Sequence, residues 1–250
     1  PDVPAFEETA YHQVAAPIMH ELIRRTIFAI DNQNARYALQ GVLFEFTDNR
    51  IAAISTDGRR LACQEGVAEV IGDHFSENTS IFSPQSLALF DKALAGNELA
   101  RIAVSENKAS FQCGMTTIHC QLVDGRFPRW RNIIPDTAGK NSVDLIVSAF
   151  MSTLGQGQVS ASKSDPGTVL TFSQGNLEIS SHSNDMGESH AEMPIAYEGA
   201  EVSIRVEPRY VMEFLRELSS DRTIQLYFIQ GASFLFQTDD GYSYVVMPLS

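Results

Sequence analysis

Val42-Leu-Phe-Glu-Phe-Thr-Asp-Asn-Arg-Ile-Ala-Ala-Ile-Ser55 reads as a strand, a turn at Asp48-Asn49 and a second strand. The same pattern returns as Val169-Leu-Thr-Phe-Ser-Gln-Gly-Asn-Leu-Glu-Ile-Ser-Ser181. Self-similarity at a fixed spacing is typical of a repeated architecture. Because the spacing is as long as a domain, the sequence predicts two copies of one fold.

Two further echoes keep the same order, and the offsets of all three echoes are about 123 to 127 positions. Pro84 with Leu87, Phe90 and Leu94 returns as Pro208 with Val211, Phe214 and Leu218, and Lys108-Ala-Ser-Phe111 returns as Gly231-Ala-Ser-Phe234. A chain of 250 residues is long enough for two domains, each with its own core. We therefore predict a first domain over residues 1–130 and a second over 131–250.

Each half is predicted to run helix, strands, helix, strands. Pro17 opens an amphipathic helix with apolar Ile18, Leu22, Ile23 and Ile27. Its polar face carries His20, Glu21, Arg24 and Arg25. Further helices are expected at 84–95, near 143–154 and from Pro208, with strands near 42–47, 51–56, 66–71, 79–83, 100–105, 108–113, 116–122, 168–173, 176–182, 188–195, 201–206, 223–229, 232–238 and 243–248.

The strand pattern indicates antiparallel sheets covered by helices. Alternation along Phe44-Glu-Phe46 and Leu177-Glu-Ile179 predicts strands buried on one face only. The fold class is therefore α+β, with two helices packed on antiparallel sheet in each domain and the helices lining one surface of a curved scaffold. Between the halves, Phe127–Pro135 holds two prolines and predicts an ordered connector.

Composition limits the function classes. A 44% hydrophobic and 20% charged chain without a long apolar run or signal peptide is typical of a soluble globular protein. The net charge of -13 argues against nucleic-acid binding on average, although a local basic face can coexist with an acidic exterior. Because the chain begins at Pro1 rather than Met, we expect a processed or trimmed fragment.

Three cysteines, sparse and odd in number, favour a reducing cytoplasm over a disulfide scaffold. Cys113 and Cys120 could face each other across a hairpin, but reduced structural thiols are favoured over metal ligands. His182 and His190 near Asp185 and Glu188 could imitate a metal site. Their spacing fits no common ligand pattern, so a solvated polar loop is favoured.

No catalytic arrangement is visible. The chain lacks a phosphate-binding Gly-rich loop and a Gly-x-Ser-x-Gly elbow. Asp57 in Thr56-Asp-Gly-Arg-Arg60 has no histidine or second carboxylate at informative spacing, which favours a turn. We predict a non-enzymatic protein with no catalytic residue, no metal and no cofactor.

Four motifs resemble those of one family. Asn34–Glu45 is similar to its "ARYxLxGxLFE", Thr56–Ala62 to "TDGHRLA", Leu122–Arg131 to "LVDGRFPDYRR" and Tyr244–Leu249 to "YVVMPMRL". The family is the beta subunit of bacterial DNA polymerase III, the replicative sliding clamp. The four matches keep their order over nearly the whole chain, which makes the resemblance specific.

The resemblance implies a processivity factor of chromosomal replication. Members have three similar domains and form a head-to-tail homodimeric ring around duplex DNA in the cytoplasm, without membrane contact. The repeat here resembles the middle and C-terminal domains, and the N-terminal domain is expected to be absent. A chain without that domain should not close the ring by the same interface, so we expect weak or no DNA retention.

A ring retains DNA by topology and needs only local basic residues on the helices that line its hole. The resemblance implies DNA-facing positions on the helices and on the loop after the first helix: Arg24, Gln33, Arg36, Tyr37, Lys92 and Arg209, with Arg25 and Arg216 as further candidates. The alternative for each helix residue is a solvated face. Ala38 stands where other members often have a second aromatic residue.

The resemblance also implies a pocket for short linear motifs of the polymerase, the clamp loader and repair proteins. Val, Met, Leu and Pro would form an apolar cleft for Leu or Phe anchors, and Arg60 could orient a polar partner. The implied residues are Leu39, Thr56, Gly58, Arg59, Arg60, Leu61, Pro128, Asn132, Ile133, Tyr210, Val245, Val246, Met247, Pro248 and Leu249.

Three departures from the family pattern predict a shifted peptide preference. Arg59 replaces the usual His, Asn132 replaces a usual Arg, and the chain ends at Leu249-Ser250. Thr56–Leu61, the connector 127–135 and Tyr244–Leu249 have no clear counterpart in the other half, so the pocket is expected there. The alternative functions are a peptide-binding adaptor that does not encircle DNA and, remotely, a hydrolase using Asp57.

Overall fold

The computed structural model describes residues 5–31, 37–74, 76–161, 167–183, 187–229 and 231–249. The chain divides into two compact units. The first unit comprises Pro1–Trp130 with Asp240–Tyr242, and the second comprises Arg131–Asp239 with Ser243–Ser250. Each unit is described by itself.

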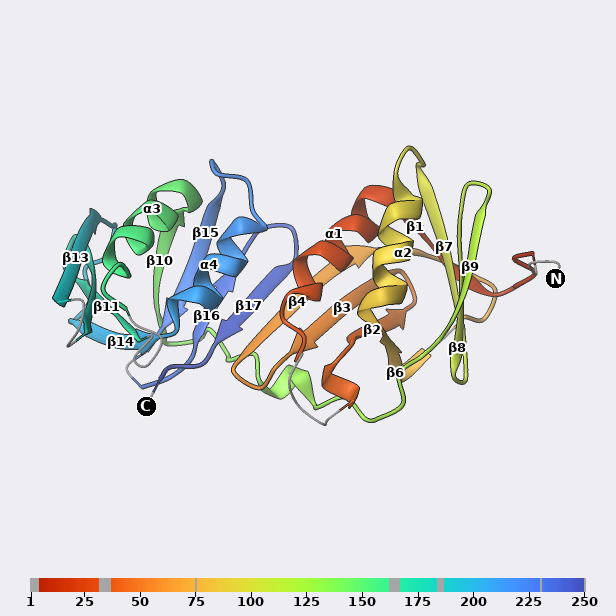
Figure 1. Cartoon of the computed structure of the whole chain (residues 1–250), viewed down its shortest axis with the longest axis horizontal. Helices are drawn as coiled ribbons and strands as arrows, with labels where there is room; N and C mark the ends of the chain where they lie inside the picture. The colour runs from red at the N-terminus through yellow and green to blue at the C-terminus, as the bar shows by residue number, and fades with distance from the viewer. Residues whose placement is uncertain are drawn as a thin grey trace. The chain divides into compact units, whose positions relative to one another are not determined.

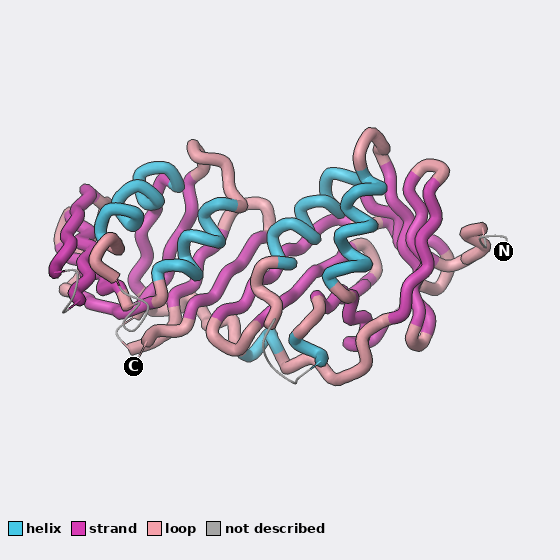
Figure 2. Tube along the Cα trace, in the orientation of Figure 1, coloured by secondary structure: helices cyan, strands magenta, loops and turns pink. Residues whose placement is uncertain are grey.

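The first unit has two layers, strands covered by two helices (Figures 1 and 2). One sheet has the order β5-β1-β7-β8-β9, and β4, β3, β2 and β6 are neighbours in that order. Helices α1 and α2 pack against each other over these strands. The elements are β1 (Tyr11–Ala15), α1 (Ala16–Ile27), η1 (Tyr37–Leu39), β2 (Val42–Thr47), β3 (Arg50–Thr56), β4 (Arg60–Val67), β5 (Glu69–Ile71), β6 (Ser76–Phe82), α2 (Pro84–Leu94), β7 (Leu99–Ser105), β8 (Lys108–Cys113) and β9 (Thr116–Gln121).

The second unit repeats this topology. Strands β10, β15, β16 and β17 are neighbours in that order, and β13, β12, β11 and β14 form a second sheet. Helices α3 and α4 pack against each other. After η2 (Trp130–Asn132) in the connector, the elements are β10 (Asn141–Ile146), α3 (Val147–Gly157), β11 (Thr168–Ser173), β12 (Asn176–Ser183), β13 (Gly187–Pro194), β14 (Val202–Val206), α4 (Pro208–Arg216), β15 (Thr223–Phe228), β16 (Phe234–Gln237) and β17 (Tyr242–Val246).

The predicted α+β class is confirmed, with four α-helices and antiparallel strand pairs in the described part of the chain. The expectation that 56–61 and 244–249 lack counterparts is wrong for the strands. In chain order and sheet order, β4 corresponds to β13, and β17 corresponds to β9. The repeat extends further than the sequence shows because equivalent strands need only similar alternation, not similar residues.

The core of the first unit lies between its helices and strands. Met19 and Leu22 of α1 and Phe90 of α2 are fully buried with Phe44 and Phe111 of the strands. The Phe90 and Phe111 rings stack with their centroids 4.3 Å apart. Burial of such side chains contributes about 1.5–3 kcal/mol each, so this contact fixes α2 on the sheet.

The predicted helix near 143–154 is wrong at its start, because 141–146 form strand β10. Val143 and Leu145 are buried between exposed neighbours, and Leu145 pairs with Ile224. This alternation has the period of a strand, and the helix begins only at Val147. A strand was also missed at β1, and the strand expected near 66–71 is two strands, β4 and β5.

Alanine substitutions at two glycines of α3 are expected to have opposite effects on the stability of the second unit. A Cβ on Gly157 would lie 2.6 Å from the backbone oxygen of Ile179, whereas a Cβ on Gly155 meets nothing within 4 Å. We expect Gly157→Ala to destabilise the second unit by about 1–3 kcal/mol and Gly155→Ala to stabilise it by about 0.5–1 kcal/mol. Urea unfolding followed by circular dichroism measures both, and equal midpoints for the two variants would contradict the packing of α3 on β12.

Candidate partner-binding site

The turn before β4 is held by Asp57. Its Oδ1 accepts hydrogen bonds from the backbone nitrogens of Arg59 at 2.9 Å and Arg60 at 3.0 Å. Gly58 has a φ of +85°, and the Thr56 hydroxyl donates to the Arg60 carbonyl at 2.6 Å. These are the bonds of a turn, as the sequence favoured. The turn presents Gly58 and Arg59 to solvent.

The guanidinium of Arg60 makes hydrogen bonds within the first unit. Arg60 is 8% exposed, and its Nε donates a hydrogen bond to Asp57 Oδ2 at 3.0 Å. Its Nη2 donates to the carbonyl of Phe28 at 2.8 Å, and its guanidinium lies over the Phe28 ring. These bonds tie the turn to the end of α1, and the role of Arg60 in orienting a polar partner stays a prediction.

A buried carboxylate anchors the connector. Glu45 Oε1 accepts a hydrogen bond from the Trp130 ring nitrogen at 2.9 Å, and both residues are buried. The Trp130 backbone nitrogen donates to the Pro128 carbonyl at 2.8 Å. Strand β2 is therefore covered on both faces, contrary to the half-buried strand expected from Phe44-Glu-Phe46. The hydrogen bond between Trp130 and Glu45 holds the start of the connector in place, and Pro128 in that segment is exposed to solvent.

Trp130→Phe tests this anchor. The ring still fills space, but a buried carboxylate loses a donor, so we expect a destabilisation of about 1–3 kcal/mol. Urea unfolding followed by circular dichroism measures the change. Met115→Leu, a substitution at a fully exposed position, serves as the control and should leave the midpoint unchanged. A Trp130→Phe midpoint equal to that of the wild type would contradict the anchoring role.

A cavity of about 520 Å³, called here the loop pocket, opens between η1 and residues 124–129 of the first unit. Gly125 has a φ of +137°, and a Cβ there would lie 2.9 Å from the Cβ of Ala38. The loop therefore approaches η1 closely only because residue 125 is glycine. The loop pocket brings together two predicted site residues, Leu39 and Pro128.

The second unit's share of the predicted site is partly buried. Val245 and Val246 are fully buried in β17, and Tyr210 accepts at its carbonyl from the Tyr244 hydroxyl at 3.0 Å. The chain after β17 is held by a bond from the Leu249 nitrogen to the Arg205 carbonyl at 2.8 Å. The accessible members are Asn132 and Met247, which is 45% exposed, with Ile133, Pro248 and Leu249 half-buried.

In the first unit, Leu39, Thr56 and Leu61 are buried. The predicted site is thus divided between side chains that shape it and a smaller set that a partner could reach. The sequence motifs contain buried and accessible residues together, because a motif does not show which of its side chains a partner can reach.

The basic helix residues that are expected to face DNA differ in solvent exposure and in ion pairing. Lys92 of α2 and Arg209 and Arg216 of α4 are exposed, whereas Arg24 of α1 pairs with Glu21 at 3.3 Å. Gln33 and Arg36 lie outside the described residues, as does the side chain of Tyr37.

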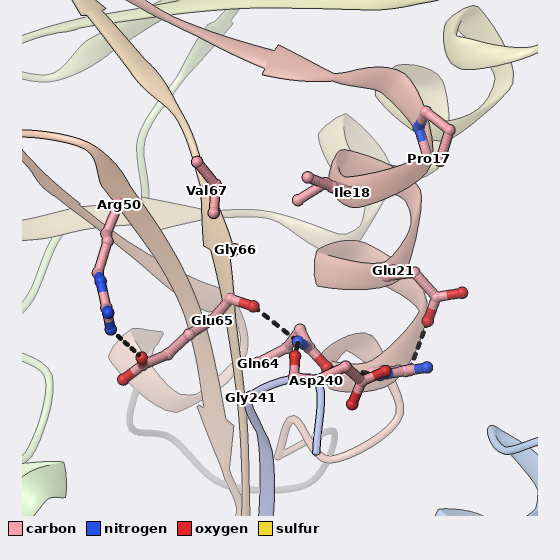
Figure 3. Close-up of a pocket in the computed structure, with 11 residues that line it drawn as sticks. Pro17, Ile18, Glu21, Arg50, Gln64, Glu65, Gly66, Val67, Asp240 and Gly241 are labelled. Atoms are coloured by element: carbon pink, nitrogen blue, oxygen red, sulfur yellow. Dashed lines mark hydrogen bonds and ion pairs between the residues drawn. The ribbon is translucent and has the colours of Figure 1, made fainter. Parts of the chain in front are cut away.

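Arg25 is not on a solvated face, which corrects the expected polar face of α1. It is 5% exposed, and its Nη1 donates to Gln64 Oε1 and Asp240 Oδ2, both at 2.8 Å. Figure 3 shows Gln64 and Asp240 converging beside α1, around a second cavity of about 450 Å³. Asp240 is 215 positions away in the sequence, so no local signal could have found this contact.

Two other groups considered from the sequence are the cysteines of the β8–β9 hairpin and the pair His182 and His190. In the β8–β9 hairpin Cys113 pairs with Thr116 and Cys120 with Ala109, so the two thiols do not face each other. Burial raises the pKa of both thiols. His190 lies between Glu192, at 2.8 Å, and Glu178, at 3.3 Å. Its hydrogen bond to Glu192 raises its pKa.

His182 lies 3.2 Å from Glu188. The histidines belong to the paired strands β12 and β13 rather than to a solvated loop, and Asp185 lies outside the described residues.

Comparisons with known proteins agree with this architecture. The family model "DNA polymerase III beta subunit, central domain" matches residues 13–129, and "DNA polymerase III beta subunit, C-terminal domain" matches 131–250. The beta sliding clamp of Escherichia coli K12 is 27% identical over 241 residues, which cover 92% of this chain and 63% of that protein. That of Halalkalibacterium halodurans is 28% identical over 225 residues, covering 88% and 59%.

Solved structures show the same fold. The DNA polymerase III subunit beta of Pseudomonas aeruginosa superposes with a TM-score of 0.90 at 23% identity, covering 100% of this chain and 69% of that one. The sliding clamp of Bacillus subtilis gives a TM-score of 0.89 at 24% identity, covering 100% and 67%. The fold is therefore that of sliding clamps, with two clamp-type domains.

The chain belongs to the DNA polymerase III beta subunit family, whose central and C-terminal domain models together match nearly all of it. It spans about three-fifths of the length of the curated relatives that it matches. Among its described residues, no helix combines the length and apolar character that crossing a bilayer requires.

Proposed function

We propose that this chain is part of a sliding clamp, a non-catalytic processivity factor of bacterial chromosomal DNA replication. The whole protein encircles duplex DNA as a head-to-tail ring and tethers the polymerase to its template. The observation that carries this proposal is the match of both halves, in order, to the central and C-terminal domains of one family. The same matches support domains at residues 1–130 and 131–250.

The tethering function requires a site for short linear motifs of the polymerase, the clamp loader and repair proteins. We assign this site to the family positions given above. Arg59 and Pro128 are its accessible side chains in the first unit, and Asn132 and Met247 in the second. Met and Pro suit apolar anchors, because a thioether adapts to different shapes and proline is already rigid.

DNA contact in this proposal is independent of base sequence. Lys92 and Arg209 are exposed cations on the helices, and phosphates attract such side chains without reading bases. Arg24, Gln33, Arg36 and Tyr37 remain proposed contacts on the family pattern. Within the part of the chain that the structure describes, Cys63, Cys113 and Cys120 form no disulfide, which suits action in the reducing cytoplasm.

Retention on DNA of defined topology tests the clamp function. The intact parent protein, loaded by its own clamp loader, should remain on a nicked circular duplex and be released when the circle is cut. In its presence, the polymerase should make longer DNA products in each binding event. Equal release from circular and linear DNA, combined with preserved peptide binding, would contradict the ring and favour a peptide-binding adaptor.

A further inference from the structure

The outer face of the β12–β13 hairpin gathers histidines and carboxylates. Helix α3 packs against the other face of these strands, where Leu177 and Ile179 are fully buried. Because successive side chains of a strand point to opposite faces, the even-numbered positions point away from α3. The long side chains of this outer face are Glu178 and His182 on β12 and Glu188, His190 and Glu192 on β13.

His190 lies at the centre of this group. Ser180 is directly opposite it in the strand pairing, and this small side chain leaves space beside the ring. Glu178 and His182 are the diagonal neighbours of His190 on β12, at a separation that long side chains can bridge. Glu178, His182, Glu188 and His190 all line one cavity of about 370 Å³.

The surroundings of the His190 ring are those of a metal-binding histidine. Its Nε2 lies 2.8 Å from Glu192 Oε1, and its Nδ1 lies 3.3 Å from Glu178 Oε1. Histidines that bind metals donate one ring N–H to a carboxylate, a carbonyl or water and hold the ion with the other nitrogen. When Nε2 donates to Glu192, the lone pair of Nδ1 is left near the Glu178 carboxylate.

The distance from His190 to Glu178 also fits a shared ion. Two ligand atoms that each lie about 2.0–2.1 Å from a tetrahedral ion are about 3.4 Å apart. A charge-assisted hydrogen bond is shorter, at about 2.7–2.9 Å. The 3.3 Å between His190 Nδ1 and Glu178 Oε1 is therefore closer to the spacing of two metal ligands.

A second pair on the same face has this spacing too. His182 Nδ1 lies 3.2 Å from Glu188 Oε1, and the two residues are directly opposite in the strand pairing. The two pairs together offer two imidazole nitrogens and two carboxylates, which is enough for a four-coordinate ion. Imidazole ligands favour Zn²⁺ and its transition-metal neighbours over Mg²⁺ and Ca²⁺.

The charge of the cavity favours a cation. Among the described residues that line it, the carboxylates of Glu178 and Glu188 outnumber the single guanidinium of Arg205. Glu192 adds a further carboxylate beside His190. Spacing along the sequence did not indicate this site, because Glu178 approaches His190 only through the pairing of β12 with β13.

We propose that the outer face of the β12–β13 hairpin binds a divalent transition-metal ion of the Zn²⁺ class. His190 Nδ1 and the Glu178 carboxylate are its first ligands, His182 and Glu188 complete the coordination, and Glu192 orients the His190 ring. The ion links β12 to β13, which is the last strand of its sheet. The competing interpretation is a set of exposed ion pairs that bind no metal.

Calorimetric titration of the metal-free 250-residue chain with Zn²⁺ tests the proposal. We expect one bound ion per chain, which an excess of Mg²⁺ does not displace. His190→Asn should weaken Zn²⁺ binding by about tenfold or more, and Glu192→Gln by about tenfold, because the partner that orients a metal-binding histidine contributes to affinity. Zn²⁺ should also raise the urea midpoint of the wild type but not that of His190→Asn, since a ligand of the folded state stabilises it.

His20→Asn is the matched control. His20 is an exposed histidine of α1 that also lies beside a carboxylate, Asp91, so its loss should leave Zn²⁺ affinity unchanged. His190 is exposed, and circular dichroism of the metal-free His190→Asn protein should match that of the wild type.

Three results would overturn the metal site. The first is absence of both Zn²⁺ binding and a Zn²⁺-dependent rise in the wild-type midpoint, which would leave only ion pairs on this face. The second is displacement of Zn²⁺ by an equal concentration of Mg²⁺, which would indicate an acidic patch without histidine ligands. The third is binding that survives His190→Asn but is lost in Cys120→Ser, which would assign the ion to the β8–β9 hairpin.

Discussion

Replacing Met247 with alanine is expected to weaken binding of a peptide with Gln, Leu and Phe anchors, called here the anchor peptide, by about tenfold or more, because central apolar anchors dominate peptide affinity. Met247 follows β17, is 45% exposed, and has a flexible thioether that can pack on Leu or Phe. Fluorescence polarisation of the labelled peptide against the 250-residue chain measures the change. Val245 and Val246 are fully buried, so Met247 is the contact that can be removed without opening the core.

Met115→Ala is the matched control for this experiment. Met115 is fully exposed in the turn between β8 and β9, so its truncation removes the same side chain without loss of packing. The control should bind the peptide like the wild type. Leu61 is unsuitable as a second variant, because it is completely buried and its truncation would test packing. Wild-type affinity in Met247→Ala would exclude this residue from the site.

Acidification from pH 6.5 to about 4 is expected to destabilise the first unit by about 2 kcal/mol through a buried histidine pair. His12 Nδ1 and His74 Nδ1 lie 2.6 Å apart. His12 Nε2 lies 2.9 Å from the Thr47 carbonyl, and the Val104 nitrogen donates to His74 Nε2 at 2.8 Å. This chain of bonds joins β1, the end of β2, β7 and the segment that precedes β6.

Only neutral histidines satisfy this chain of bonds. A carbonyl accepts, so His12 Nε2 carries a hydrogen and His12 Nδ1 is an acceptor. The Val104 nitrogen donates, so His74 Nε2 is an acceptor and its Nδ1 carries the hydrogen that bonds to His12. An added proton on either ring would place two donors face to face.

The pKa values agree in sign with that geometry. Burial and the neighbouring His12 lower the pKa of His74 to about 4, against the opposing charge of Glu8. Burial also lowers the pKa of His12, which the Thr47 carbonyl and Asp48 oppose. The unfolded chain therefore binds more protons than the folded one between pH 6.5 and about 4, and the stability is full above pH 6.5 and lost as the pH falls through this range.

Urea unfolding at pH 7.5, 5.5 and 4.5, followed by Trp fluorescence, measures this loss. The chain has a single tryptophan, Trp130, and it lies in the first unit. His74→Gln keeps a donor and an acceptor but does not titrate, so its stability should depend less on pH than that of the wild type. Carboxylates titrate equally in both proteins. The same pH dependence in both would show that the histidine pair does not control acid stability.

The sequence predicted elements whose apolar periodicity is local. β2–β3 and β11–β12 were found because each pair consists of two runs rich in apolar residues with a turn between them. β1 was missed because its buried positions include a polar residue, His12. β10 was read as helix because Leu145 of the strand and Phe150 and Leu154 of α3 follow one another without a glycine or proline between them.

The candidate site was predictable to a similar extent. Motifs named its residues, but the burial of Leu61 and the engagement of Arg60 depend on contacts that no local pattern encodes. Arg25 shows the same limit, since its partner Asp240 comes from the other end of the chain.

Hydrogen exchange of the 250-residue chain, with and without a saturating concentration of the anchor peptide, tests the central claim most directly. The claim is that the family's partner site lies at η1, the turn before β4, the connector and the chain after β17. Protection on peptide binding should be confined to backbone amides of residues 37–39, 56–61, 123–133 and 244–249. Protection absent from these segments, and found instead on the equivalent strands β11–β13 of the second unit, would contradict it.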